Sequence, residues 1–222
     1  MENERMSYEE ALAYIHGAQR FKGTKLLERM EFLLSLLGNP HKQLKFVHIA
    51  GTNGKGSIAH MISKSLTESG YKTGLFISPY VVDFRERIQI DGELISKEEL
   101  AEIASEVKAA DLKARESGLY VTEFQIVTLC GLLYFCRKGC DIAVLEVGLG
   151  GRLDATNVIS GYECAAIAHI DYDHTHILGN TLEEITHEKC GILKGGELSL
   201  YPVQAEETFR TAEAECLRTR CV

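Results

Sequence analysis

The sequence predicts an α/β protein with an open, mostly parallel sheet and helices on both faces. Short apolar runs alternate with helical patterns from residue 45 onward, a rhythm that is typical of parallel sheets with covering helices. The first of these runs leads into a glycine-rich turn with a lysine and a hydroxyl, and a helical pattern follows at once. Conspicuous polar residues follow the predicted strand ends, which is where open α/β sheets bind ligands.

The chain before the sheet is predicted to be helical. Ser7–Leu37 has two helical stretches with a break near Gly17–Gly23, and Gly38–Pro40 stops the second one. Lys45–Ala50 is predicted as the first core strand, and the helix after its turn ends at Gly70.

Capping boxes, in which Ser or Thr is followed three residues later by Glu or Gln, predict three helix starts. The remaining predicted elements are a strand at Lys72–Ile77, a hairpin at Arg87–Ile95 around Asp91-Gly92, a helix from Ser96 to about Ser117, a helix from Thr122 to Gly139, strands at Asp141–Val147 and Cys164–Ile170, a helix from Thr181 to Cys190, a strand at Glu197–Tyr201 and a helix at Gln204–Arg220.

Composition excludes several classes of protein. The 222 residues carry 32 acidic and 24 basic side chains, a net charge of −8, which argues against a general nucleic-acid or anionic-membrane binder. The first ten residues are polar, and the longest apolar run, Ile126–Cys136, is too short to span a bilayer. Seven cysteines without a C-x-x-C motif indicate reduced, mostly buried thiols. We expect a cytoplasmic monomer without nucleic-acid or membrane partners.

The turn after the first strand has the layout of a phosphate-binding loop. Backbone N–H groups and the start of the next helix bind phosphates in such loops. Lys55 would reach the β- and γ-phosphates and Ser57 would hold Mg²⁺. The general G-x-x-x-x-G-K-[ST] pattern is not met, because position 49 is Ile and Gly56 separates the lysine from the hydroxyl. The candidate ATP-binding residues are Gly51, Thr52, Asn53, Gly54, Lys55, Gly56 and Ser57.

Three further strand ends carry polar residues, at Ser78-Pro79, Glu146 and Asp171–His174. A carboxylate beside a triphosphate usually serves Mg²⁺, although Glu146 alone could equally be an acid that faces solvent. His174 and His176 have the H-x-H spacing of a weak zinc signal, so the residues leave the identity of the metal open.

Other candidates have ordinary interpretations on their own. Lys189 is predicted near a helix C-terminus, where a lysine normally complements the helix dipole. The histidines interpreted as core or helix-surface residues are His48, His60, His169 and His187.

Seven ordered motifs nevertheless give a specific resemblance over nearly the whole chain. They are Y-E-E-A-L-A-Y-I-H, G-T-N-G-K-G-S, G-L-F-I-S-P-Y with F-R-E-R-I-Q-I-D-G, V-T-E-F-Q, E-V-G-L-G-G-R-L-D-A-T-N, D-Y-D-H-T-H-I-L-G and H-E-K-C-G-I-L-K. The chain resembles the folylpolyglutamate synthases, which are Mur-type amide ligases.

The resemblance implies roles for individual residues. Lys55 and Ser57 bind phosphate and Mg²⁺, Ser78 and Glu146 serve the first metal, and His174 serves a second one with Glu146. Lys189 matches a lysine that family members carbamylate, which adds a ligand for metal. Lys55, Glu146, His174 and Lys189 are thus the implied catalytic residues, and the implied substrate-binding residues are Ser78, Pro79, Arg85 and Asp154.

The implied activity is an ATP-dependent amide ligase that adds L-glutamate to tetrahydrofolate through an acyl phosphate. Its partners are ATP, reduced folate and L-glutamate, with two Mg²⁺ sites. A dihydrofolate synthase, a bifunctional enzyme and a catalytically inactive ATP-binding fragment remain alternatives. Residues 1–222 are expected to form the N-terminal ATP-binding domain, incomplete at its C-terminus, with the C-terminal ligase domain absent.

Overall fold

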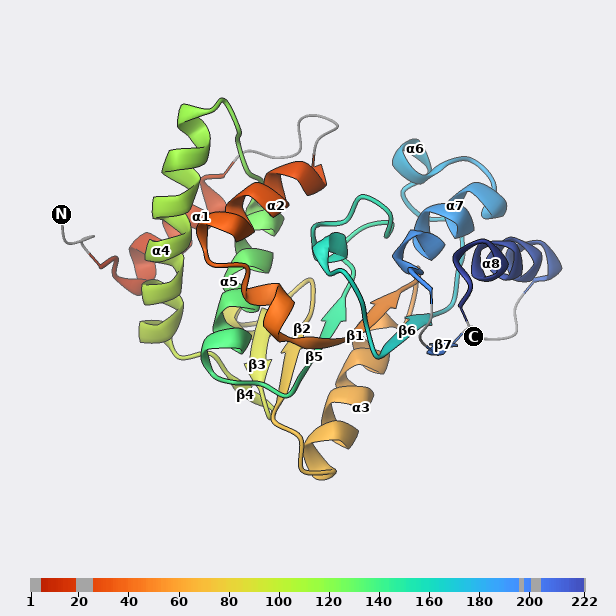
Figure 1. The fold of residues 1–222 in the computed structure, drawn as a ribbon, viewed down its shortest axis with the longest axis horizontal. Helices are drawn as coiled ribbons and strands as arrows, with labels where there is room; N and C mark the ends of the chain where they lie inside the picture. Colours follow the sequence, from red (N-terminus) through yellow and green to blue (C-terminus); the bar gives the residue numbers. More distant parts are fainter. Residues whose placement is uncertain (1–4, 19–25, 196–197, 201–204, 222) are drawn as a thin grey trace.

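The computed structural model describes residues 5–18, 26–195, 198–200 and 205–221, and these residues contain one seven-stranded sheet (Figure 1). The strand order is β4-β3-β2-β5-β1-β6-β7. Neighbours from β2 to β7 pair in parallel, whereas β3 and β4 add an antiparallel hairpin at one edge. The predicted open, mostly parallel sheet is therefore confirmed.

The elements have the following bounds. The strands are β1 (Lys45–Ala50), β2 (Thr73–Phe76), β3 (Ile88–Ile90), β4 (Glu93–Leu94), β5 (Ile142–Glu146), β6 (Cys164–Ile167) and β7 (Leu198–Leu200). The α-helices are α1 (Tyr8–His16), α2 (Leu26–Leu36), α3 (Lys55–Glu68), α4 (Lys97–Glu116), α5 (Glu123–Arg137), α6 (Thr175–Leu178), α7 (Leu182–Lys189) and α8 (Glu206–Thr219). The 3₁₀ helices are η1 (Pro40–Gln43), η2 (Phe84–Arg87), η3 (Ala155–Val158) and η4 (Cys190–Ile192).

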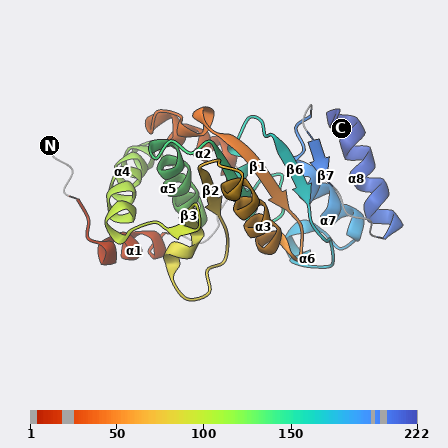
Figure 2. The same cartoon turned by 90° about the horizontal axis from the view of Figure 1, so that it is seen from below.

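The central strands are buried on both faces because successive side chains point to opposite sides of a strand. In β1, Phe46 and Ala50 join a large core under α5, while Val47 and Ile49 join a smaller core under α3. Helix α3 covers one face of the sheet, and α5 covers the other with α1, α2 and α4 outside it (Figures 1 and 2). This arrangement confirms helices on both faces.

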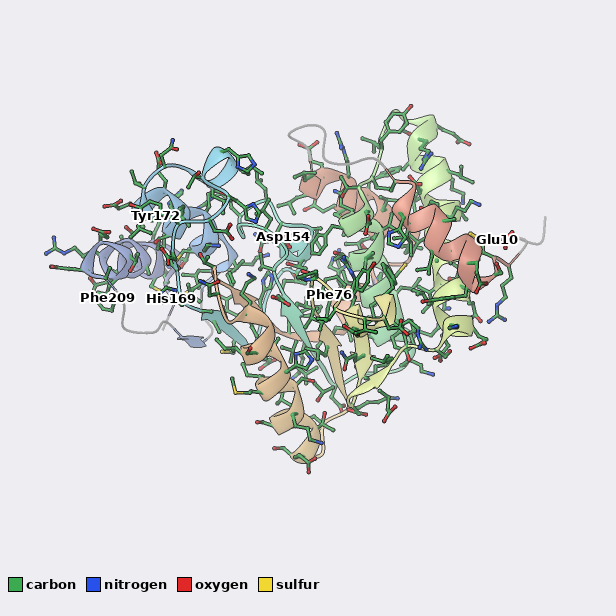
Figure 3. All side chains as sticks on the ribbon, turned by 180° about the vertical axis from the view of Figure 1, so that it is seen from behind. Glu10, Phe76, Asp154, His169, Tyr172 and Phe209 are labelled. Carbon is green, nitrogen blue, oxygen red and sulfur yellow. The ribbon has the colours of Figure 1, made fainter. Side chains whose placement is uncertain are left out.

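The two ends of the molecule are helical. Helices α7 and α8 pack on each other beside the β6–β7 end of the sheet (Figure 1). Figure 3 shows Glu10 of α1 and Phe209 of α8 at opposite ends, with Phe76 of β2 between them. Asp154 lies between the sheet and the segment that carries Tyr172 in the same view.

Most predicted elements are confirmed, including the capping boxes at Ser96, Thr122 and Thr181. The start of the predicted hairpin, at Arg87, is wrong by one residue. Arg87 ends η2, and the first hairpin strand, β3, starts at Ile88. The 3₁₀ helices and α6 were not predicted, since such short elements leave no periodicity to detect. Part of the predicted break, the ends of the Glu197–Tyr201 strand and Gln204 lie outside the described residues.

Two expectations from composition can be compared with the structure. None of the helices in the described part of the chain has the length and apolar character needed to cross a membrane. None of the seven cysteines, all of which the structure describes, forms a disulfide: three are buried, Cys130, Cys140 and Cys190, and four, including Cys216 and Cys221, are half-buried. The prediction that most of them are buried is therefore wrong, since only three of the seven are buried.

Candidate functional site

The carboxyl ends of the parallel strands meet at one edge of the sheet. Ile49 of β1 lies opposite Glu146 of β5, and Ala50 lies opposite Ile167 of β6. Strand β2 runs beside β5 in the same direction. The segments that follow β1, β2, β5 and β6 therefore begin side by side, as the sequence predicted.

The loop after β1 depends on glycine for its conformation. Gly51 has a φ of +147°, and a Cβ there would lie 2.7 Å from the Cβ of Ala168, so a larger residue would displace the neighbouring strand end. Gly54 adopts a φ of +82° and precedes the first residue of α3, Lys55. The first N–H groups of a helix have no intrahelical acceptor, so this loop and α3 together form an anion-binding geometry.

Contacts with two other segments hold this loop. The backbone N–H of Thr52 donates to the His169 carbonyl at 2.7 Å, just beyond β6. The Lys189 ammonium, from the end of α7, donates to the Gly51 carbonyl at 2.9 Å. Lys55 donates to the Thr52 carbonyl at 3.1 Å. Both lysines thus lie at the phosphate loop, although they are far apart in sequence.

Glu146 points toward α3 because β5 alternates its side chains between the two cores. Its carboxylate is buried and accepts a hydrogen bond from the Ser78 backbone N–H at 2.9 Å. Burial raises the pKa of this carboxyl, while the Ser78 bond and the Lys55 charge act in the opposite direction. A Cβ on Gly56 would lie 3.4 Å from Oε2, so glycine leaves space there. A carboxylate oxygen beside such a space fits a hard cation such as Mg²⁺.

Lys189 is a buried amine rather than a surface lysine at a helix end. Its exposed fraction is 3%. Burial, reinforced by the nearby Lys55 charge and opposed by Asp173, lowers the pKa of Lys189 to about 8. The neutral amine is the form that reacts with CO₂ to form a carbamate, and the lowered pKa makes it more accessible than in an exposed lysine.

His174 and His176 are exposed at the start of α6, with ring centroids 6.3 Å apart. The Nε2 atom of His174 lies 3.6 Å from a carboxylate oxygen of Asp173. Among the described residues no group of three or more His, Cys, Asp or Glu side chains could hold a metal, so the H-x-H zinc alternative lacks a third ligand of these types there. The metal-binding roles of His174 and Ser57 stay predictions.

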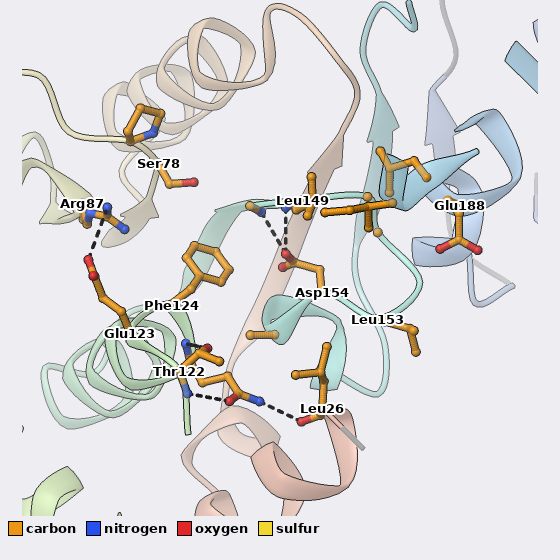
Figure 4. Close-up of a pocket in the computed structure, with 18 residues that line it drawn as sticks. Leu26, Ser78, Arg87, Thr122, Glu123, Phe124, Leu149, Leu153, Asp154 and Glu188 are labelled. Atoms are coloured by element: carbon orange, nitrogen blue, oxygen red, sulfur yellow. Dashed lines mark hydrogen bonds and ion pairs between the residues drawn. The ribbon is translucent and has the colours of Figure 1, made fainter. Parts of the chain in front are cut away.

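A cavity of about 550 Å³ opens beside this edge (Figure 4). Its walls come from the segment after β2, from η2 and α5, from the loop after β5, and from α2, α6 and α7, and they are mostly apolar. The lining includes Ser78, Pro79, Arg87, Phe124, Leu149, Leu153, Asp154 and Glu188. Because Ser78 also bonds Glu146, the cavity and the phosphate loop share one wall.

Asp154 lines this cavity, and its carboxylate is already satisfied within the chain, so its role in substrate binding stays a prediction. Oδ2 accepts from the N–H groups of Gly148 and Leu149, at 3.1 and 3.0 Å. Oδ1 accepts from the backbone N–H and the hydroxyl of Thr156, at 2.9 and 2.6 Å. The side chain therefore shapes the wall of the cavity (Figure 4).

Arg85 does not line this cavity, and its predicted role in substrate binding stays a prediction. Its guanidinium pairs with Asp83 at 2.7 Å. Arg87, two residues later, lines the cavity instead. Both arginines belong to η2 (Phe84–Arg87), and the conformation of this short helix separates the directions of their side chains.

Four histidines were predicted to be core or helix-surface residues, and the prediction is confirmed for three of them. His48 is buried in β1, whereas His60 and His187 are exposed on α3 and α7. His169 was predicted wrongly, because it is exposed beyond β6 and bridges to Asn53 of the phosphate loop.

Comparisons with known proteins agree with this geometry. Residues 49–213 match the family model of the Mur ligase middle domain. The chain is 40% identical over 215 residues to the dihydrofolate synthase/folylpolyglutamate synthase of Bacillus subtilis, covering 96% of this chain and 50% of that protein. The chain thus spans about half the length of the curated relatives it matches.

Solved structures show the same fold. The apo form of L. casei FPGS superposes with a TM-score of 0.92 at 38% identity, covering 96% of this chain and 52% of that one. An FPGS–AMPPCP–folate complex superposes with a TM-score of 0.92 at 37% identity and the same coverage. Sequence, fold and the family match together show that the chain belongs to the Mur ligase family, within its middle domain.

Proposed function

We propose that this chain supplies the ATP site and the folate-binding cavity of an ATP-dependent folate–glutamate ligase. The observation that carries the proposal is the shared wall at Ser78, which joins the phosphate loop and Glu146 to the apolar cavity. A structural relative was solved with AMPPCP and folate together. A flat pterin and a benzoyl group suit apolar walls such as Phe124 and Leu149.

The proposed reaction has two steps. A carboxylate of the folate attacks the γ-phosphorus of ATP; a C–O–P linkage forms, the bond to the β-phosphate oxygen breaks, and ADP leaves. The amine of glutamate then attacks the acyl carbon; the amide C–N bond forms, phosphate leaves, and the amine loses its proton to solvent. Little covalent assistance is needed, since positioning and charge neutralisation dominate phosphoryl transfer.

Different residues of this chain would bind the phosphates, the acceptor and the metal ions. Lys55 and the N–H groups at the start of α3 hold the phosphates, and the cavity holds the acceptor and excludes water from the acyl phosphate. Glu146, with Ser57 and Ser78, would hold Mg²⁺, which neutralises charge on the transferring phosphate when bound. His174 and Lys189, the latter as a carbamate, would contribute to a second metal site. The low pKa of Lys189 supports carbamate formation.

The acceptor could be tetrahydrofolate or dihydropteroate, because the B. subtilis relative carries both names. Dihydrofolate synthase and bifunctional activity are therefore retained as the second candidate function. Supplying glutamate and ATP with each acceptor in turn, and measuring the amide product, separates the two.

Binding is the direct test, because the chain spans half the length of its relatives. We expect the chain to bind ATP with Mg²⁺ in calorimetry, and Lys55→Ala to weaken that binding about 30-fold or more, since a desolvated phosphate loses its charged partner. Lys64→Ala is a matched control, since that lysine is exposed on the same helix. Equal ATP affinities for Lys55→Ala and the unsubstituted chain would refute the ATP site. Bound ¹³CO₂, observed by NMR and lost in Lys189→Met, tests the carbamate.

A further inference from the structure

Arg87 is a charged side chain in the wall of the cavity without a close partner for its charge. Its side chain is 12% exposed. The guanidinium lies over the rings of Tyr80 and Phe84, 5.3 and 5.5 Å from their centroids. Its Nε is buried and has no hydrogen-bond partner. Stacking of this kind fixes the plane of the guanidinium and leaves its edge available.

The carboxylate nearest to Arg87 is Glu123, at a distance of 4.0 Å. That is the outer limit of an ion pair and too long for a hydrogen bond. Glu123 also lies 3.4 Å from Nδ1 of His16, so its carboxylate has a second polar neighbour. Buried charges are normally paired and hydrogen-bonded. Arg87 therefore retains capacity for another anion.

The position of Arg87 indicates which anion this is. Arg87 and Ser78 lie at the same side of the cavity, with Phe124 between them and Asp154 (Figure 4). Ser78 in turn bonds Glu146, which faces the phosphate loop. A carboxylate at this side lies toward the ATP site, and the remainder of a flat molecule extends along Phe124 toward Asp154.

We propose that Arg87 binds the acceptor carboxylate and orients it for attack on ATP, in competition with Glu123. A guanidinium edge matches the two oxygens of a carboxylate. The ligand class is an aromatic heterocycle that ends in a benzoate-type carboxylate. This inference rests on the proposed function, and it assigns the recognition of the reacting group to Arg87.

The test uses pteroate, which has one carboxylate, and its primary carboxamide. Their affinities for the purified chain are measured by calorimetry. We expect Arg87→Gln to weaken pteroate binding about 30-fold or more and to change carboxamide binding less than threefold. Glu123→Gln removes the competing anion, so it should strengthen pteroate binding and leave the carboxamide unaffected.

A control variant makes the result specific. Arg137→Gln alters a surface arginine on α5 that pairs with Glu106, and it should not change the ratio of the two affinities. The inference is overturned if Arg87→Gln weakens both ligands equally, if Arg137→Gln reproduces its effect, or if Glu123→Gln weakens pteroate binding. Should Arg87→Gln fail to fold, the sign of the Glu123→Gln effect still decides. ATP binding, measured separately, reports on the proposed function itself.

Discussion

At the scale of single residues, Glu146 is the clearest case of a side chain whose burial as a carboxylate lowers the stability of the fold. Every other residue of β5 is apolar, and burial raises the pKa of the Glu146 carboxyl. Its one backbone hydrogen bond, from Ser78, does not replace full hydration. Such a group is expected where a ligand rather than the fold benefits from the charge.

Glu146→Gln should therefore make the chain more stable and impair the site. The amide keeps the shape and can still accept from Ser78, while the buried charge is gone. We expect the melting temperature at pH 7 to rise by about 2–4 °C, which corresponds to about 1 kcal/mol, and Mg²⁺-dependent ATP affinity to fall. Glu163→Gln, at an exposed position, is the control. Lower stability with unchanged ATP affinity would contradict the assignment.

The buried ammonium of Lys189 should make the free energy of unfolding depend on pH. Its pKa is lowered from 10.5 to about 8 by burial, so the folded chain binds fewer protons than the unfolded chain between these values. The free energy of unfolding should rise with pH from about 8 to 10.5 through this group, and the penalty is complete below about 8. Lys189→Met should then be more stable at pH 7 by about 2 kcal/mol, after the lost Gly51 bond is counted.

The measurement is urea unfolding from pH 7 to 10 in CO₂-free buffer. Part of the rise should remain in Lys189→Met, because burial also lowers the pKa of Lys194 to about 8. An unchanged pH profile in the variant would contradict the buried ammonium.

At the scale of elements, a buried hydrogen-bonded chain connects β1 to the cavity wall. His48 Nε2 lies 2.8 Å from the Thr156 hydroxyl, and that hydroxyl donates to Asp154 at 2.6 Å. Burial lowers the pKa of His48 to about 3, so its imidazole is neutral. The wall of the cavity is thereby tied to the centre of the sheet through η3.

Thr156→Val should test this connection, because valine keeps the shape and removes the hydroxyl. Two buried polar groups lose a partner, so we expect a loss of about 2–3 kcal/mol in the free energy of unfolding. Thr156→Ser keeps the hydroxyl and should lose about 1 kcal/mol. Chemical denaturation of both variants is the measurement; equal losses would show that the hydroxyl is unimportant.

At the scale of the whole molecule, periodicity made most of the fold predictable. The short, mostly apolar runs that form β1 and β5 and the capping boxes are local signals, and the structure confirms them. Local signals also placed the phosphate loop at the correct edge. They could not separate Arg85 from Arg87, or show that His169 bridges to the loop, because those depend on backbone turns and on contacts more than a hundred residues apart in sequence.

The distribution of cysteines tests the packing of the whole molecule in one experiment. Burial raises the pKa of Cys130 and Cys190 to about 12 and of Cys140 to about 11. Since only the thiolate reacts with a disulfide reagent, these three buried thiols should react only when the chain opens. We expect at most four thiols to react quickly in native buffer, and all seven in denaturant. Mass mapping of the modified residues identifies which ones react. Rapid native labelling of Cys130 or Cys190 would contradict the core, because both are fully buried in the large hydrophobic core.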